Sequence, residues 1–303
     1  MKEILFISGK GGTGKTSLTS SFIQLADNCI ACDYDVDASN LPILLKPQKV
    51  SNHDFSAGYT AHIDEETCIS CGLCAELCRF DAISEEFQVL PLSCEGCRFC
   101  EKICPVEAIT MYPRSSGHWS EGVFNQKQKL FFADLRPGEE NSGKLVAQVK
   151  TMARTMADTE QTQLIIADGP PGIGCAVISS MVGVDLIVLV TEPSRSGFHD
   201  LQRVYQLMQL RGIKGILIIN KWDLNPDISQ EIENWAQKND LPLAGKIPFS
   251  EVIVQSIARG KIPATNPEVR KMLFPLWENI IEQVNRVPTA KGRGIVINSG
   301  NPK

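Results

Sequence analysis

Eight cysteines in the middle of the chain follow one spacing twice, and this repeat restricts the possible folds more than any other feature of the sequence. The first run has the pattern C-x2-C-x2-C-x3-C at Cys68, Cys71, Cys74 and Cys78. The second run repeats it at Cys94, Cys97, Cys100 and Cys104 and is followed by Pro105. The segments Cys68–Ile83 and Cys94–Ile109 superpose with an offset of 26 residues. The repeat therefore predicts two copies of one small metal-binding unit.

The composition supports metal binding by these cysteines. The chain has 303 residues, a net charge of −5 and 11 cysteines, and no block of lysine or arginine that would favour nucleic-acid binding. Its longest apolar stretches, such as Leu186–Val190, have the length of strands and are too short to span a membrane. Lys2 leads directly into an apolar stretch, so we expect no secretory signal and a cytoplasmic protein. In that compartment cysteines bind metals more often than they form disulfides.

The spacing of the cysteines is typical of iron–sulfur ligands. A C-x2-C-x2-C run places three thiolates within reach of one [4Fe–4S] cluster, and in two-cluster ferredoxins the fourth ligand comes from the other run. One predicted ligand set is therefore Cys68, Cys71, Cys74 and Cys104, and the other is Cys78, Cys94, Cys97 and Cys100. The segment resembles bacterial dicluster ferredoxins throughout, except that Arg79 stands where the second copy has Pro105. The alternative is two zinc sites of four thiolates each, although zinc motifs usually consist of paired C-x2-C knuckles.

A glycine-rich loop near the N-terminus predicts a nucleotide-binding site. The sequence of residues 9–16 fits G-x4-G-K-[ST] and lies between a predicted strand, Ile4–Ile7, and a predicted helix, Gly14–Ala26. In this motif backbone N–H groups bind the phosphates, and the N-terminus of the helix favours their negative charge. We expect Lys15 to bind the outer phosphates and Thr16 to ligate Mg²⁺. The predicted nucleotide-binding residues of the loop are Gly9, Gly11, Gly12, Thr13, Gly14, Lys15, Thr16 and Ser17.

Apolar strands alternate with helical segments on both sides of the cysteine-rich segment. After a second strand at Cys29–Asp33, the predicted strands are Leu130–Asp134, Leu164–Asp168, Leu186–Val190, Gly215–Asn220 and Leu243–Ile247. Such alternation predicts an α/β fold with a doubly wound, mostly parallel sheet. We expect a discontinuous nucleotide-binding domain at 1–58 and 113–287, an inserted ferredoxin-like domain at 59–112, and a loose tail at 288–303.

The glycine-rich loop and the motifs after it resemble one superfamily of ATPases. With Lys10, the loop has the K-G-G-x-G-K-[ST] form of the deviant Walker A motif in the superfamily of MinD, ParA and the nitrogenase iron protein. The sequence of residues 33–37 resembles switch I of that superfamily, and 165–174 resembles Walker B and switch II. The ferredoxin-like segment is inserted after switch I. The resemblance implies ATP hydrolysis at a dimer interface, where Lys10 contacts nucleotide across the dimer.

Three aspartates are predicted to complete the magnesium and hydrolysis site. Asp168 ends a buried strand beside the phosphate loop and is placed to hold Mg²⁺ through water. Asp35 is the residue we expect to orient the attacking water, with Asp33 as the alternate. The predicted magnesium site is thus Thr16, Asp35 and Asp168, and the predicted catalytic residues are Lys10, Lys15, Asp35 and Asp33. A role in capping a helix or turn is the alternative for the aspartates.

Two further features concern the residues that bind the nucleotide base and the cysteine at position 175. Asn220-Lys221-Trp222-Asp223 fits N-K-x-D, the guanine-reading pattern of GTPases, whereas the resemblance implies that Asn220 contacts adenine. We expect Asn220 and Asp223 to bind the base of ATP, with GTP as the alternative. Cys175 follows switch II, and we expect it to pack, with a place at a dimer interface as the alternative.

Together these features predict an ATP-hydrolysing iron–sulfur protein. We expect its nucleotide state to control electron transfer through two [4Fe–4S] clusters to a redox or metallocofactor protein, with ATP and Mg²⁺ as further cofactors. The alternatives are a carrier or scaffold for iron–sulfur or molybdenum-type cofactor assembly and a positioning ATPase like MinD or ParA. No basic patch or membrane-targeting amphipathic helix supports the positioning role. We expect a homodimer or a heterodimer with a paralogous ATPase, no nucleic-acid or membrane partner, and an anaerobic or low-oxygen source.

Overall fold

The computed structural model describes residues 1–139 and 141–287, which form two compact units. Of the described residues, the larger unit comprises Met1–Asn52, Trp119–Asp134 and 142–287, and the smaller unit comprises His53–His118 and 135–141 without residue 140. Glu140 and the predicted tail, 288–303, lie outside the described residues.

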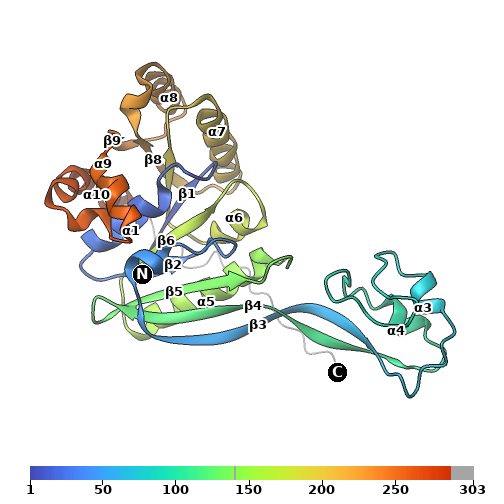
Figure 1. Ribbon diagram of the computed structural model, residues 1–303. Coiled ribbons are helices and arrows are strands. Elements are labelled where there is room, and N and C mark those ends of the chain that lie inside the picture. The colour runs from blue at the N-terminus through green and yellow to red at the C-terminus, as the bar shows by residue number, and fades with distance from the viewer. Residues whose placement is uncertain (140, 288–303) are drawn as a thin grey trace. The chain divides into compact units, whose positions relative to one another are not determined.

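The larger unit is built around a parallel sheet (Figure 1). Its parallel strands follow the spatial order β5-β2-β6-β1-β7-β8-β9. They are β1 (Lys2–Ser8), β2 (Ile30–Asp33), β5 (Gln128–Leu135), β6 (Leu164–Pro171), β7 (Leu186–Thr191), β8 (Lys214–Asn220) and β9 (Leu243–Ile247). The strand order reverses at β1, so the carboxyl end of β1 lies at a switch point, where open α/β sheets bind their ligands. The predicted doubly wound fold is confirmed.

Helices lie on both faces of this sheet (Figure 1). They are α1 (Lys15–Leu25), α2 (Leu41–Leu45), α5 (Ser142–Thr159), α6 (Cys175–Ser180), α7 (Arg195–Leu210), α8 (Pro226–Lys238), α9 (Glu251–Ala258) and α10 (Pro267–Arg286), with 3-10 helices at Trp222–Leu224 and Pro263–Thr265. Successive side chains of β1 point to opposite faces. Glu3 therefore pairs with Lys150 and Arg154 of α5, at 2.9 and 2.6 Å, whereas Ile4 and Phe6 pack into the hydrophobic cluster that includes α1 and α10.

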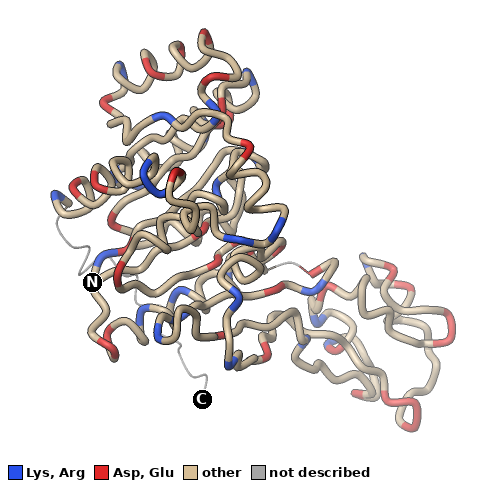
Figure 2. The backbone as a smooth tube through the Cα atoms, turned by 60° about the vertical axis from the view of Figure 1, so that its left-hand side comes forward, with Lys and Arg blue, Asp and Glu red and all other residues tan. Residues whose placement is uncertain are grey.

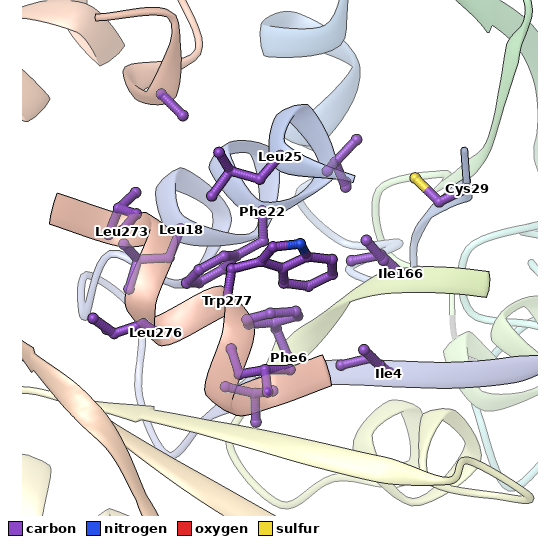
Figure 3. Close-up of a cluster of buried hydrophobic side chains, with 14 of the residues drawn as sticks. Ile4, Phe6, Leu18, Phe22, Leu25, Cys29, Ile166, Leu273, Leu276 and Trp277 are labelled. Atoms are coloured by element: carbon purple, nitrogen blue, oxygen red, sulfur yellow. The ribbon is translucent and has the colours of Figure 1, made fainter. Parts of the chain in front are cut away.

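Aromatic packing on the α1 and α10 face supports the helix that follows the phosphate loop (Figure 3). The ring of Phe22 on α1 stacks on Phe6 of β1 at 5.3 Å and on Trp277 of α10 at 5.7 Å between centroids. Phe6 and Phe22 are fully buried, and Trp277 is nearly so. Because α1 begins at Lys15, this packing fixes the position of the loop that precedes it.

The smaller unit holds both cysteine repeats between two long strands. These strands, β3 (Gln48–Ile63) and β4 (Ile109–Phe124), are neighbours in the sheet order. Two short helices, α3 (Leu73–Glu76) and α4 (Phe99–Ile103), begin at equivalent positions of the two copies. The unit extends beyond the predicted segment 59–112 at both ends, because β3 and β4 continue past it. It also includes Leu135–Asn141, where Glu139 pairs with Arg114 at 2.6 Å.

Candidate functional site

The glycine-rich loop connects β1 to α1 and has a backbone that side chains would obstruct. Gly12 and Gly14 have φ angles of 82° and 87°, in the left-handed region that favours glycine. A Cβ atom on Gly14 would lie 2.4 Å from Nδ2 of Asn220, and one on Gly9 would lie 2.4 Å from Cβ of Asp200. Gly14 and Gly9 are therefore required by the close approach of β8 and α7, and the loop has the geometry of a phosphate cradle.

Asp168 brings together the residues predicted to bind phosphate and magnesium. Lys15 Nζ lies 2.9 Å from Oδ1 of Asp168, and the Thr16 hydroxyl donates to Oδ2 at 2.5 Å. Thr19 also donates to Oδ1, at 2.8 Å, and Asp168 is only 1% exposed. A hydroxyl and a carboxylate held this closely suit Mg²⁺, whose preferred ligands are oxygens.

The two candidate switch I aspartates have different surroundings. Asp33 is buried, and its carboxylate accepts hydrogen bonds at 3.0 Å from the N–H of Asp35, the N–H of Leu41 and the Ser39 hydroxyl. Burial and nearby Asp168 raise the pKa of Asp33 to about 7, although Lys15 acts in the opposite direction. Asp33 thus holds the turn after β2, as the capping alternative anticipated.

Asp35 lies in the same turn but is only half-buried. Burial raises its pKa to about 6, while Lys15 acts to lower it and Asp168 to raise it. Because Asp33 is occupied by three backbone and side-chain donors, Asp35 is the better placed of the two carboxylates to bind a water molecule. The choice of Asp35 over Asp33 stays a prediction.

A carboxylate that the sequence did not single out binds two lysines at the loop. Glu192, which follows β7, has one oxygen 2.8 Å from Lys10 Nζ and the other 2.9 Å from Lys221 Nζ. Lys10 Nζ also lies 3.1 Å from the hydroxyls of Ser194 and Ser196. No motif pointed to Glu192. The only available signal was its place at the carboxyl end of a predicted strand.

The N-K-x-D segment lies beside the loop, but its Asp has a structural partner. Asn220 is buried and donates to the Thr13 carbonyl at 2.8 Å, while Asp223 accepts from the N–H of Phe249 at 2.6 Å. This bond occupies Oδ1 of Asp223, and the second carboxylate oxygen can still accept a hydrogen bond from a base. Among the described residues, Thr13 Oγ1 is the buried side-chain oxygen or nitrogen that lacks a hydrogen-bond partner.

The cysteines of one predicted ligand set surround a small cavity in the smaller unit. The four are Cys68, Cys71, Cys74 and Cys104. The rest of the lining is Gly72 and apolar residues, namely Ile63, Ile69, Leu73, Phe87, Pro105, Val106, Ala108 and Ile109. Four thiols around an apolar cavity have the chemistry of a [4Fe–4S] site, so these residues fit the predicted cluster.

The two copies are linked by matching backbone hydrogen bonds. The N–H of Asp64 donates to the carbonyl of Ala108, and its equivalent Leu90 donates to Ala82, both at 2.8 Å. The N–H groups of Ala82 and Ala108 donate in turn to the sulfurs of Cys78 and Cys104, at 3.4 and 3.3 Å. These are the two cysteines predicted to cross between copies, and both have one backbone donor to stabilise a thiolate.

Two remaining observations bear on metals and membranes. Within 1–139 and 141–287, no group of three or more Cys, His, Asp and Glu is close enough to hold a single metal ion. In the same residues, no helix is long and apolar enough to cross a membrane. Cys175 is exposed at the start of α6, so the prediction that it packs is wrong.

Comparisons with known proteins match both units. Residues 61–111 match the family model of a 4Fe-4S dicluster domain. An uncharacterized protein of Methanocaldococcus jannaschii is 36% identical over 228 residues, which cover 74% of this chain and 79% of the relative. Pyruvate synthase subunit PorD of Methanothermobacter marburgensis is 37% identical over 49 residues, 16% of this chain and 60% of PorD. The crystal structure of the Pyrococcus furiosus cell division ATPase MinD has a TM-score of 0.56 at 18% identity, covering 93% of this chain and 98% of that chain.

Proposed function

We propose that this chain uses ATP hydrolysis to control electron transfer through two [4Fe–4S] clusters to a protein partner. The chain belongs to one family with the uncharacterized Methanocaldococcus jannaschii protein, has the fold of the MinD/ParA P-loop ATPases and carries a 4Fe-4S dicluster domain. The observation that carries the proposal is the presence, in one chain, of a phosphate cradle and a four-thiol apolar cavity. Neither a plain ferredoxin nor a plain positioning ATPase needs both.

The hydrolysis site would use the residues gathered around Asp168. Lys15 would exchange its bond to Asp168 for a bond to the outer phosphates, and Thr16, Asp35 and Asp168 would hold Mg²⁺. Asp35 orients the water that attacks the terminal phosphate, and Asp33 keeps the turn that carries Asp35 in place. Bound Mg²⁺ supplies charge neutralisation on the phosphates.

The chain provides a route by which this site would affect the clusters. The switch I turn leads through α2 directly into β3, and β3 leads into the first cysteine copy. A change in the turn when phosphate is lost is therefore transmitted along one continuous segment of backbone. The cysteine copies would carry the electrons, with the Cys78 and Cys104 sulfurs tuned by their backbone donors.

Charge indicates the kind of surface that a redox partner would present. Residues 53–118 contain 11 Asp and Glu but only 4 Lys and Arg, and Figure 2 shows these acidic residues spread over the cysteine loops. A partner with a positively charged docking surface fits this distribution. The similarity of the segment to a pyruvate synthase subunit favours a redox role over a purely structural one.

An anaerobic electron-transfer assay tests the proposal. The purified protein should contain about eight iron atoms per chain, as two [4Fe–4S] clusters require. After capture of a partner with a non-hydrolysable ATP analogue, electron transfer from the reduced clusters to that partner should depend on ATP and fail in Lys15→Ala. Equal transfer with and without ATP would refute the coupling.

The fold favours one second candidate, an ATP-dependent positioning protein like MinD. The structural similarity to MinD over nearly the whole chain supports it. Imaging of the tagged protein in cells distinguishes the two functions, because a positioning ATPase redistributes with ATP turnover even when the cysteines of both clusters are replaced by serine.

A further inference from the structure

Lys10 is bound within its own protomer, although the family resemblance gives it a role across a dimer. Its ammonium group contacts Glu192 at 2.8 Å and the hydroxyls of Ser194 and Ser196 at 3.1 Å. Glu192 is anchored on rigid structure, since it directly follows β7 and β7 pairs with β1 beside the phosphate loop. To reach a nucleotide in a second protomer, Lys10 must leave all three groups.

Glu192 has a second lysine partner, which lowers the free-energy cost of moving Lys10 away from Glu192. Lys221 Nζ lies 2.9 Å from the other oxygen of Glu192 and 3.0 Å from the Gly12 carbonyl in the phosphate loop. When Lys10 leaves, the carboxylate keeps Lys221 and no partly buried charge is left unpaired. Burial acts to raise the pKa of Glu192. The bonds to Lys10 and Lys221 act to lower it and outweigh burial, so the pKa of Glu192 lies below its ordinary value. Glu192 is therefore ionised at neutral pH.

We propose that Glu192 is a positioning residue that holds Lys10 in its own protomer. When two ATP-bound protomers pair, Glu192 releases Lys10 and keeps Lys221 as its remaining cation. Glu192 thereby sets the nucleotide concentration at which pairing begins. Lys221 weakens the hold on Lys10 by sharing the carboxylate, so the base-side N-K-x-D segment adjusts the availability of the dimer lysine. The inference rests on the proposed ATP-dependent function of this site.

Sedimentation of the full-length, cluster-loaded protein with Mg²⁺ and a non-hydrolysable ATP analogue tests the proposal. Glu192→Gln keeps the shape of the side chain but removes its charge, so half-maximal pairing should occur at about three- to fivefold less analogue, the scale of a partly exposed ion pair. The matched control is Glu231→Gln, which removes an exposed ion pair with Arg195 and should leave pairing unchanged. Lys221→Ala should shift pairing in the opposite direction, because Glu192 then binds Lys10 alone.

Combined variants exclude a merely structural role. The effect of Glu192→Gln should vanish in a Lys10→Ala background, and Lys221→Ala should add nothing to Glu192→Gln. If the wild-type protein pairs, but Glu192→Gln needs the same or a higher concentration of analogue to pair, this inference alone is overturned. Wild-type protein that neither binds the analogue nor pairs overturns the proposed ATP-dependent function as well.

Discussion

Replacement of Gly14 by alanine should destabilise the larger unit by more than the same replacement at Gly12. Both residues have left-handed φ angles, 87° and 82°, so each alanine incurs a backbone cost of about 1–2 kcal/mol. A Cβ on Gly12 meets nothing within 4 Å, whereas one on Gly14 lies 2.4 Å from Nδ2 of Asn220. Displacing Asn220 breaks its bond to the Thr13 carbonyl, which adds about 1 kcal/mol. The expected losses in free energy of unfolding are thus about 1–2 kcal/mol for Gly12→Ala and about 2–3 kcal/mol for Gly14→Ala.

Urea denaturation followed by tryptophan fluorescence measures this difference, because all 4 tryptophans lie in the larger unit. The measurement is made without nucleotide, so that binding does not mask the change in stability. Asn220→Ala provides a further check, since it removes the atoms that the Gly14→Ala methyl group strikes. In that background the two alanine variants should cost the same. Equal costs of Gly12→Ala and Gly14→Ala in the wild-type background would refute the explanation by close approach.

Four further variants test other parts of the structure. Asp168→Asn should abolish ATP hydrolysis and lower the free energy of unfolding by about 3–5 kcal/mol, because it leaves the Lys15 ammonium buried without its charge partner. A stable, active variant would contradict the role assigned to Asp168. Cys104→Ala should remove the cluster of Cys68, Cys71 and Cys74 and about half of the iron, while the second cluster keeps its EPR signal. Cys78→Ala should remove the second cluster instead. Loss of the same EPR signal in both variants would contradict the ligand sets. Phe22→Ala should cost about 3–5 kcal/mol in urea denaturation through loss of contacts with Phe6 and Trp277, and a loss below 1 kcal/mol would contradict the packing.

The nucleotide-binding half of the site could be predicted because its chemistry is local. The phosphate loop joins a strand to a helix within a few residues, and the spacing alone identifies Lys15 and Thr16. Asp168 was predicted from its position at the end of a buried strand, since parallel strands end at the same edge of the sheet. The structure brings it to the predicted lysine and threonine.

What the sequence could not show depends on contacts between distant segments. The Glu192 carboxylate meets Lys10 only because β7 pairs with β1, a neighbour relation that no short motif encodes. Asp223 fits a guanine-reading pattern, yet it binds the N–H of Phe249. The length of β3 was missed for a different reason. Most of its side chains are exposed, so the strand lacks the alternation of apolar and polar residues by which strands are recognised.

The crossing of the two cysteine copies has a consequence for how the protein is made. Cys104 lines the same cavity as Cys68, Cys71 and Cys74, so the first cavity is incomplete until residue 104 has been synthesised. In the proposed ligand sets, the second site needs Cys78 from the copy made earlier. The two sets are therefore completed within four residues of each other, at Cys100 and Cys104. In these ligand sets, neither cluster can be completed from the first copy alone, so iron and sulfide would be incorporated only after both copies have been translated.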